Sequence, residues 1–326
     1  MKRNIFVTGA AGFIGFHLCK ELLEQGSAVF GLDNLNRYYD PALKESRLAI
    51  LARYPGFRFI KGDLEDRDGI RAIVREGGYD TVIHLAAQAG VRYSLTNPEA
   101  YISSNLVGFF HVIDACKEFG VPHFVYASSS SVYGANEKLP FSEADPAERP
   151  VSLYAATKKS NELVAYSYSH MFGLKTTGFR FFTVYGPYGR PDMALFVFVK
   201  RILEGKPIEV NNYGDMQRDF TYVDDVTAGI MALMERSAAL TADGVPYRIY
   251  NIGNAAPVGL LEFIRAIEEE LGKRAEITYM PLPAGDVKAT FADTSDIRRD
   301  TGFAPHTDLR DGVKRFVAWY RAYYGV

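Results

Sequence analysis

A glycine-rich turn near the N-terminus constrains the fold of this chain more than any other feature. Gly9, Gly12 and Gly15 directly follow the apolar run 5–8 and open a helical pattern over 13–24. Glycines here let the backbone turn tightly and approach a pyrophosphate, whose charge meets the helix N-terminus. Because the spacing is G-x-x-G-x-x-G and not G-x-G-x-x-G, the strand before it and the helix after it carry the prediction. A purely structural turn is the alternative.

Short apolar runs alternate with helical patterns through the first half of the chain. This alternation predicts an α/β fold with a doubly wound parallel (Rossmann) sheet. Two long helical stretches, 98–119 and 153–172, carry apolar residues on more than one face. A partner subunit could cover the outer face, and burial within a monomer is the alternative. The expected strands are 5–8, 28–32, 57–60, 81–85, 124–127 and 176–182.

The pattern loosens after Tyr185. The segment 186–191 reads as a loop, 194–203 and 260–271 as helices, and 218–234 as a connection back to the main sheet before 250–252. We therefore expect a smaller C-terminal α/β domain interleaved with the first, and a ligand cleft between them. The predicted dinucleotide domain is 1–183 with 219–256, and the predicted substrate domain is 184–218 with 257–326.

Residues at the ends of the expected strands indicate the cofactor. A carboxylate at Asp33 would accept both ribose hydroxyls of adenosine and repel a 2′-phosphate, which favours NAD over NADP. Arg37 lies close enough in sequence to keep NADP as an alternative. Asp63, after the third strand, could reach the adenine amino group or cap its own loop. Small residues at Ala86 and Ala87 would let the dinucleotide pass close to the fourth strand.

Tyr154 and Lys158 lie four residues apart within a helical pattern and so share one face of the helix. An ammonium near a phenol favours the phenolate and lowers its pKa from about 10 towards working pH. Such a pair is a proton acceptor for a sugar or alcohol hydroxyl. The spacing alone is common on helix surfaces, so the prediction depends on the rest of the chain.

Composition excludes several other classes of protein. The net charge is −2 over 326 residues with both signs scattered, so nothing predicts a nucleic-acid or membrane partner. Cys19 and Cys116 do not form a C-x-x-C motif, which favours a reducing, cytoplasmic location. The histidines show no metal-ligand spacing, and no metal is expected. No apolar segment is long enough to span a membrane.

These motifs together resemble the extended short-chain dehydrogenase/reductase superfamily from residue 4 to about residue 320. The resemblance implies that Tyr154 is the base, that Lys158 holds Tyr154 and the nicotinamide ribose, and that Ser129 binds the reacting hydroxyl. Together with Tyr154 and Lys158, the implied cofactor-binding residues are Gly9, Ala11, Gly12, Phe13, Ile14, Gly15, Asp33, Asn34, Asp63, Leu64, Leu85, Ala86, Ala87 and Gln88.

Two positions after Ser129 separate the branches of that superfamily. Nucleotide-sugar 4,6-dehydratases carry an Asp-Glu pair there and UDP-glucuronate decarboxylases carry a Glu, whereas this chain has Ser130 and Ser131. Without a carboxylate, dehydration lacks its acid and base. The segments 87–94, 153–162 and 181–194 closely resemble the UDP-glucuronate 4-epimerases. In that family the residues matching Thr183 and Arg190 surround the sugar carboxylate, a task that suits the fork of an arginine.

The resemblance implies NAD-dependent C4 epimerisation of UDP-glucuronate to UDP-galacturonate through a transient 4-keto sugar, with decarboxylation suppressed. A UDP-glucose-type 4-epimerase, a UDP-glucuronate decarboxylase and a catalytically silent NAD-binding protein are the alternatives. A homodimer through helices 98–119 and 153–172 is expected. Asn211 and Pro283 depart from the family pattern near uracil. The implied substrate-binding residues are Arg92, Ser129, Ser130, Ser131, Thr183, Arg190, Val210, Asn211, Arg218 and Asp286.

Overall fold

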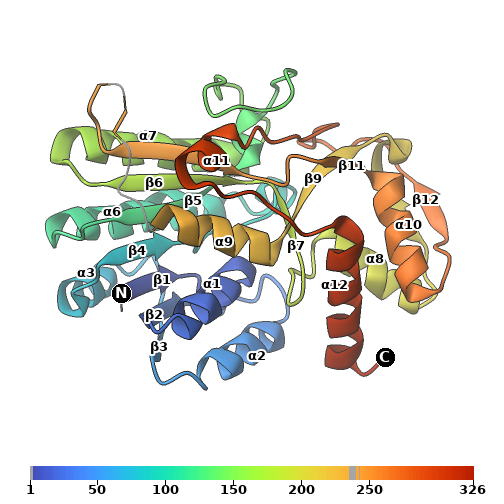
Figure 1. The fold of residues 1–326 in the computed structure, drawn as a ribbon, viewed down its shortest axis with the longest axis horizontal. Coiled ribbons are helices and arrows are strands. Elements are labelled where there is room, and N and C mark those ends of the chain that lie inside the picture. Colours follow the sequence, from blue (N-terminus) through green and yellow to red (C-terminus); the bar gives the residue numbers. More distant parts are fainter. Residues whose placement is uncertain (1–2, 235–239, 242) are drawn as a thin grey trace. The chain divides into compact units, whose positions relative to one another are not determined.

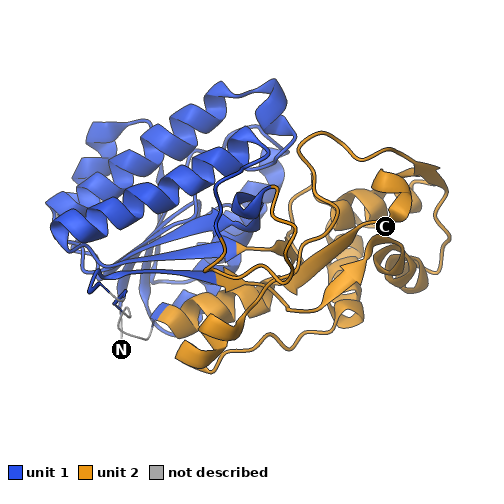
Figure 2. Ribbon diagram, turned by 90° about the horizontal axis from the view of Figure 1, so that it is seen from above, with its two compact units in different colours: residues 1–134, 146–180, 234–250 blue, residues 135–145, 181–233, 251–326 orange. Residues whose placement is uncertain are grey.

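The computed structural model describes residues 3–234, 240–241 and 243–326. The described chain forms two compact units, coloured separately in Figure 2. Unit 1 comprises 1–134, 146–180 and 234–250, and unit 2 comprises 135–145, 181–233 and 251–326. Residues 1–2, 235–239 and 242, which fall within the predicted dinucleotide domain, lie outside the described residues. The functional domain boundaries given above stay a prediction.

Unit 1 is built on a seven-stranded sheet in the order β10-β6-β5-β4-β1-β2-β3 (Figure 1). The chain crosses over between β1 and β4, and the pairs β1–β2 and β1–β4 are parallel. This is the predicted Rossmann arrangement, in which ligands bind where the strand order reverses. The strands are β1 (Asn4–Thr8), β2 (Ala28–Asp33), β3 (Phe57–Lys61), β4 (Thr81–His84), β5 (Phe124–Ser129), β6 (Thr176–Phe181) and β10 (Tyr247–Ile252).

Burial explains why the strands of this sheet read as continuous apolar runs. Ile5, Phe6 and Val7 in β1 are fully buried although successive side chains point to opposite faces. A parallel sheet is covered by helices on both faces, so apolar side chains predominate on both faces of its central strands. Figure 2 shows helices of unit 1 side by side over one face. The helices of unit 1 are α1 (Phe13–Glu24), α2 (Pro41–Leu51), α3 (Arg67–Gly77), α4 (Tyr93–Thr96), α5 (Glu99–Tyr101), α6 (Phe109–Glu118) and α7 (Leu153–Phe172).

The expected continuous helix over 98–119 is interrupted. A seven-residue π-helix, η1 (Ile102–Gly108), separates α5 from α6. Asn105 within it is buried and bonds to residues outside the helix, which gives a physical reason for the wider turn. Such segments often accompany functional sites. A short 3-10 turn, η2 (Ser130–Tyr133), follows β5.

Unit 2 contains two small sheets. The connection predicted over 218–234 begins with β9 (Gln217–Tyr222), which pairs with β7 (Thr183–Tyr185) and β11 (Pro257–Gly259). The second sheet pairs β8 (Ile208–Val210) with β12 (Ile277–Tyr279). The helical elements of unit 2 are α8 (Ala194–Leu203), the 3-10 segment η3 (Asn211–Gly214), α9 (Val223–Met234), α10 (Leu260–Leu271), α11 (Ser295–Thr301) and α12 (Leu309–Tyr324).

Candidate active site

The glycine turn forms a close-packed cradle at the ends of β1 and β4. Gly9 has a φ of +76°, and a Cβ added there would lie 2.8 Å from the amide nitrogen of Ala86. A Cβ on Gly15 would lie 2.0 Å from the carbonyl oxygen of Gly9. Gly12 is the N-cap of α1 and provides no side-chain cap. The helix N-terminus is thus free of a competing side-chain oxygen, as binding of a pyrophosphate requires.

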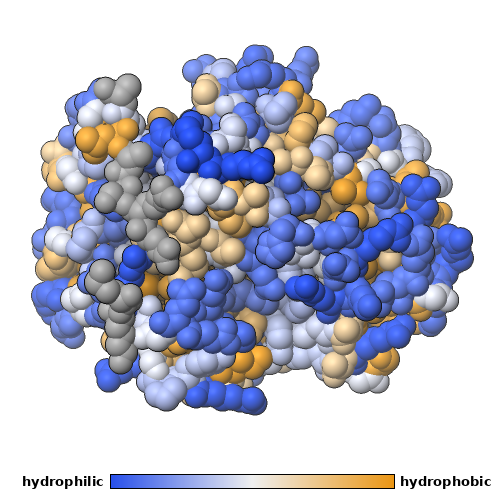
Figure 3. Space-filling model, viewed as in Figure 1, coloured by the Kyte–Doolittle hydropathy of each residue, from blue (hydrophilic) through white to orange (hydrophobic). Residues whose placement is uncertain are grey.

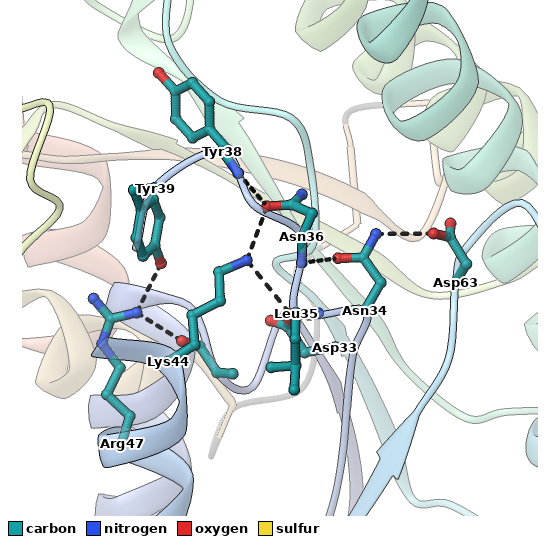
Figure 4. Close-up of polar contacts among 10 residues, drawn as sticks. Asp33, Asn34, Leu35, Asn36, Tyr38, Tyr39, Lys44, Arg47 and Asp63 are labelled. Atoms are coloured by element: carbon teal, nitrogen blue, oxygen red, sulfur yellow. Dashed lines mark hydrogen bonds and ion pairs between the residues drawn. The ribbon is translucent and has the colours of Figure 1, made fainter. Parts of the chain in front are cut away.

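The side chains at the end of β2 form the polar cluster drawn in Figure 4. Asp33 is buried, and its Oδ1 accepts a hydrogen bond from the Leu35 amide at 2.8 Å. The Nζ of Lys44 lies 3.7 Å from the same oxygen. Asn34 donates to Asp63 Oδ2 at 2.8 Å, which joins the ends of β2 and β3. The structure therefore places three of the sequence-predicted cofactor residues together.

Two basic residues of this cluster were missed by sequence reasoning. Lys44 and Arg47 are both buried on α2 (Pro41–Leu51), and Arg47 donates to the Ala11 carbonyl at 2.7 Å and to the Tyr39 hydroxyl at 2.8 Å. Burial lowers the pKa of Lys44. Their spacing of three residues on a helix with apolar neighbours was the available signal, because it places both on one buried face.

The segment after β4 is held by the π-helix. Asn105 accepts a hydrogen bond from the Gln88 amide at 2.8 Å and donates to the Gln88 carbonyl at 3.0 Å. It also donates to Thr157 Oγ1 on α7 at 3.1 Å. Leu85, Ala86 and the buried Gln88 are thereby kept in register with the helix that carries Tyr154.

Tyr154 and Lys158 lie on the first turns of α7. Ser152 caps this helix by accepting from the Ala155 amide at 3.1 Å, which sets where the helix begins. The Lys158 ammonium is buried and donates to the Ala127 carbonyl in β5 at 2.8 Å. Burial lowers its pKa to about 8, so it still carries a charge at neutral pH. The pair is therefore an ammonium and a phenol one helical turn apart, as predicted.

A second buried basic group near Lys158 is neutral. Burial, with the charge of Lys158, lowers the pKa of His84 to about 3. Its Nδ1 shares a hydrogen bond with Thr8 Oγ1 at 2.9 Å. His84 therefore links β4 to β1 and, being uncharged at neutral pH, adds no positive charge beside the Lys158 ammonium.

Ser129 ends β5 and caps the turn that follows it. Its Oγ accepts from the Ser131 amide at 3.2 Å and donates to Ser131 Oγ at 3.0 Å. Ser129 is buried, whereas Ser130 and Ser131 are partly exposed. Three hydroxyl groups therefore gather where β5 meets η2, and no carboxylate lies among them.

The remaining predicted residues of unit 1 flank this region. The ring centroids of Tyr101 and Tyr154 are 6.1 Å apart with the rings edge to face. Leu64 is buried, and its carbonyl bonds to the His111 ring at 2.8 Å. Arg92 is exposed and precedes α4.

In unit 2, Arg190 lies in the loop between β7 and α8. Its Nε and Nη2 form a bidentate pair with the Asp192 carboxylate at 3.0 and 2.5 Å. Thr183 is partly exposed at the start of β7. The fork of Arg190 thus holds the Asp192 carboxylate in this structure, and its role toward a sugar carboxylate stays a prediction.

Two of the predicted nucleotide-side residues of unit 2, Arg218 and Asp286, are in contact. Arg218 on β9 donates from Nη2 to Asp286 Oδ1 and to the Val287 carbonyl, both at 2.7 Å. Val210 is buried at the end of β8, and Asn211 follows it at the start of η3. The Arg218 guanidinium therefore ties β9 to the segment that carries Asp286 and Val287.

Hydrophilic residues cover much of the face drawn in Figure 3, and its apolar residues form separate groups. None of the helices in the described residues is long and apolar enough to cross a membrane. Within those same residues, no cluster of three or more His, Cys, Asp or Glu side chains is placed to bind a metal ion.

The sheet order, the glycine turn and the Tyr154–Lys158 pair define the short-chain dehydrogenase/reductase class of enzymes. The model of the NAD dependent epimerase/dehydratase family matches residues 5–253, and the chain belongs to this family.

Similar proteins confirm the predicted resemblance to the UDP-glucuronate 4-epimerases. A probable UDP-glucuronate 4-epimerase of Rhizobium meliloti is 47% identical over 96% of this chain and 96% of its own length. An uncharacterized 37.6 kDa protein of Escherichia coli O111:H- is 53% identical over 98% of this chain and 99% of its own. The UDP-glucuronic acid 4-epimerase of Bacillus cereus, solved with UDP-glucuronic acid and NAD, is 34% identical, with a TM-score of 0.91 over 99% of this chain and 100% of that structure.

Proposed function

We propose that this protein interconverts UDP-glucuronate and UDP-galacturonate with NAD as a bound cofactor. The observation that carries the proposal is the buried Lys158 ammonium one helical turn from Tyr154. It donates to the Ala127 carbonyl in β5, the strand that ends at Ser129. The relatives from Rhizobium meliloti and Bacillus cereus support this choice of substrate.

The residues of unit 1 fit NAD. The cradle between Gly9 and Gly15 admits no side chain, and the N-terminus of α1 faces it without a side-chain cap. Asp33 would hold the adenosine ribose, Asn34 and Asp63 the adenine side, and Ala86 with Gln88 the passage along β4. When bound, NAD supplies the acceptor and later the donor of the C4 hydride, so there is no net oxidation.

The chain's own residues handle the proton. Tyr154, as phenolate, accepts the proton of the C4 hydroxyl, and the positive charge of Lys158 stabilises that phenolate. Ser129 holds the same hydroxyl through its Oγ. After the sugar turns over and C4 receives its hydride on the opposite face of the ring, Tyr154 returns the proton to the C4 oxygen.

The proposed 4-keto sugar has a hazard, because its carbonyl is β to the C5 carboxylate and such acids lose CO₂ readily. Loss of CO₂ requires the breaking C–C bond to align with the carbonyl π system. We assign the restraint that prevents this alignment to Arg190, Thr183, Ser130 and Ser131, which offer a cation and hydroxyl donors to the carboxylate. Arg92 is a further contact of the acidic sugar in this proposal.

The nucleotide is assigned to residues of unit 2. Arg218 would bind the diphosphate, and Asp286 keeps its guanidinium oriented by the hydrogen bond at 2.7 Å. Val210 and Asn211 would line the uracil side. Asn211 offers an amide where many relatives carry an aromatic ring, so uracil would be recognised here by hydrogen bonds.

We also propose a homodimer through the helices of 98–119 and 153–172 and a cytoplasmic location. Support for the dimer comes from large apolar side chains that are exposed on η1, α6 and α7: Ile102, Val107, Phe110, Leu163, Met171 and Phe172. Support for the location comes from Cys19 and Cys116, which are both buried free thiols. Light scattering of Phe110→Asp beside wild type tests the dimer, because a charge in a buried interface dissociates it.

A product assay tests the proposed reaction. Purified protein incubated with UDP-glucuronate, without added NAD, should yield UDP-galacturonate by chromatography or NMR. UDP-xylose as the main product would identify a decarboxylase. Turnover of UDP-glucose in place of UDP-glucuronate would identify a neutral-sugar epimerase, and absence of turnover even with added NAD would leave a silent binding protein.

A further inference from the structure

A buried ion pair lies one helical turn beyond Lys158 on α7. Arg180 on β6 donates to Glu162 through two parallel hydrogen bonds, Nε to Oε1 and Nη2 to Oε2, both at 2.8 Å. Glu162 is 1% exposed and Arg180 is 3% exposed. Replacement of a buried pair by apolar residues is often neutral for stability, so stability alone does not explain its presence here.

The pair reaches the end of β5 through a serine. Ser128, which directly precedes Ser129, donates its hydroxyl proton to Glu162 Oε1 at 2.6 Å. The Arg180 guanidinium also lies over the ring of Tyr133 in η2, with Cζ 4.7 Å from the ring centroid. One carboxylate thus joins α7 to β5 and β6, and its cationic partner contacts the turn after β5.

The protonation state of the pair is settled by its contacts. Burial alone would raise the pKa of Glu162, but the hydrogen bonds and charge of Arg180, with Lys159 and Ser128, hold it below its ordinary value. The carboxylate is therefore ionised and accepts from Ser128. Because an ionised acceptor gives a strong hydrogen bond, this contact resists displacement of the strand.

Two consecutive residues of β5 are bound by two consecutive turns of α7. The Ala127 carbonyl accepts from Lys158, and the Ser128 hydroxyl bonds to Glu162. Tyr154, Lys158 and Glu162 recur every four residues and so form one stripe along the helix. The distance between the Ser129 and Tyr154 hydroxyls thus depends on a register that both bonds maintain.

We propose that Glu162 and Arg180 are positioning residues that act through Ser128 to hold Ser129 in register with Tyr154 and Lys158. The inference rests on the proposed epimerase function. A misplacement of about 1 Å in a catalytic group can lower a rate roughly a hundredfold. Loss of the Ser128 contact should therefore reduce turnover although Ser128 itself touches neither substrate nor cofactor in this proposal.

The test compares two buried serines that both attach α7 to a neighbouring strand. Ser128→Ala removes the bond to Glu162. Ser169→Ala is the matched control, because Ser169 Oγ shares a hydrogen bond with Thr176 Oγ1 at 2.7 Å near the far end of the same helix. Both serines are 2% exposed or less, so each substitution deletes one buried hydroxyl contact. Both proteins should fold, whereas Glu162→Gln would leave a buried arginine charge uncompensated.

Ser128→Ala should lower kcat for UDP-glucuronate by roughly tenfold to a hundredfold, with KM and bound NAD changed less than about threefold. The apparent pKa in its kcat–pH profile should also shift. A displaced β5 moves the Ala127 carbonyl that holds the Lys158 ammonium, and so changes the distance from that ammonium to the Tyr154 hydroxyl. Ser169→Ala should keep kcat within about twofold and the pH profile unchanged while losing a similar amount of thermal stability. Equal kcat values and equal pH profiles in the two variants would overturn the inference.

A second measurement separates this inference from the proposed function. If wild-type protein fails to convert UDP-glucuronate, the function is wrong, but the phenolic pKa of Tyr154 still reports the register. It can be followed by NMR of protein carrying ¹³C-labelled tyrosine, with Tyr154→Phe to assign the signal. A shift of that pKa in Ser128→Ala and not in Ser169→Ala supports the positioning role, and the same pKa in both variants contradicts it.

Discussion

The ring of Tyr188 lies against the indole of Trp319, with 4.9 Å between the ring centroids. Tyr188 belongs to the loop that carries Arg190, and its φ of +56° is unusual for a residue other than glycine. Trp319 lies on α12 and is the single tryptophan of the chain. The C-terminal helix therefore supports the loop that we assign to the sugar carboxylate.

The fluorescence of Trp319 should respond to UDP-glucuronate. Binding of the carboxylate should draw Arg190 away from Asp192 and shift the loop that also carries Tyr188, so the emission of the indole in contact with that ring should change. UDP alone should produce a smaller change, because it lacks the carboxylate. A titration of wild type and of Arg190→Ala measures this, and an equal response in the two proteins would contradict the expected link.

Replacement of Arg190 should raise KM for UDP-glucuronate. Loss of a charge-assisted pair costs roughly tenfold to a hundredfold in binding, so Arg190→Ala should show a rise of that order and release some UDP-xylose. Asp192→Asn should lower KM, because the side chain that competes for Arg190 loses its charge. Steady-state kinetics with product analysis measures both, and a KM unaffected by either substitution would remove Arg190 from the carboxylate site.

Tyr154→Phe should abolish most of the epimerase activity. Loss of a general base typically costs roughly a hundredfold to ten-thousandfold in rate, and the phenyl ring preserves the packing against Tyr101. Tyr168→Phe is the control on the same helix, since the Tyr168 hydroxyl bonds to Asp114 at 3.1 Å at the other end. Bound NAD should be equal in both variants, and near wild-type turnover by Tyr154→Phe would show that another group is the base.

Epimerase activity should fall as the pH rises above about 8. The pKa of Lys158 is lowered to about 8 by burial, and loss of its proton removes the charge that stabilises the Tyr154 phenolate. A kcat profile between about pH 6 and pH 10 measures this. Activity that stays constant to about pH 10 would show that the charge of Lys158 is not needed.

The lowered pKa of Lys158 should also make the free energy of unfolding depend on pH. Because the folded pKa of Lys158 lies below its unfolded value of about 10.4, the unfolded chain binds more protons between these two pH values. The free-energy cost of burying the charged Lys158 ammonium therefore lowers stability fully below about pH 8, and it decreases as the pH rises. Lys158→Met should therefore be more stable than wild type near pH 7, by on the order of 3 kcal/mol, with a smaller difference near pH 9.5. Denaturant unfolding at both pH values checks the narrowing.

Most of the fold could be predicted from the sequence, because its signals are local. Apolar runs bounded by turns located the strands of the main sheet, and the glycine turn identified where β1 meets α1. The interruption of the helix over 98–119 could not be predicted, since the π-helical turn accompanies the bonds of Asn105 to Gln88 and Thr157. Those partners are near in space and remote in sequence.

The candidate site divides in the same way. The sequence alone determined that Tyr154 and Lys158 share one helix face, because that follows from their spacing. It suggested Ser129 and the serines after it through the family resemblance, and their catalytic roles stay a prediction. The contacts of Lys44 with Asp33, of Arg180 with Glu162 and of Tyr188 with Trp319 were decided by tertiary structure. Each joins elements that meet only when the chain folds, and burial then changes the pKa of groups such as Lys158 by removing water that no sequence pattern can report.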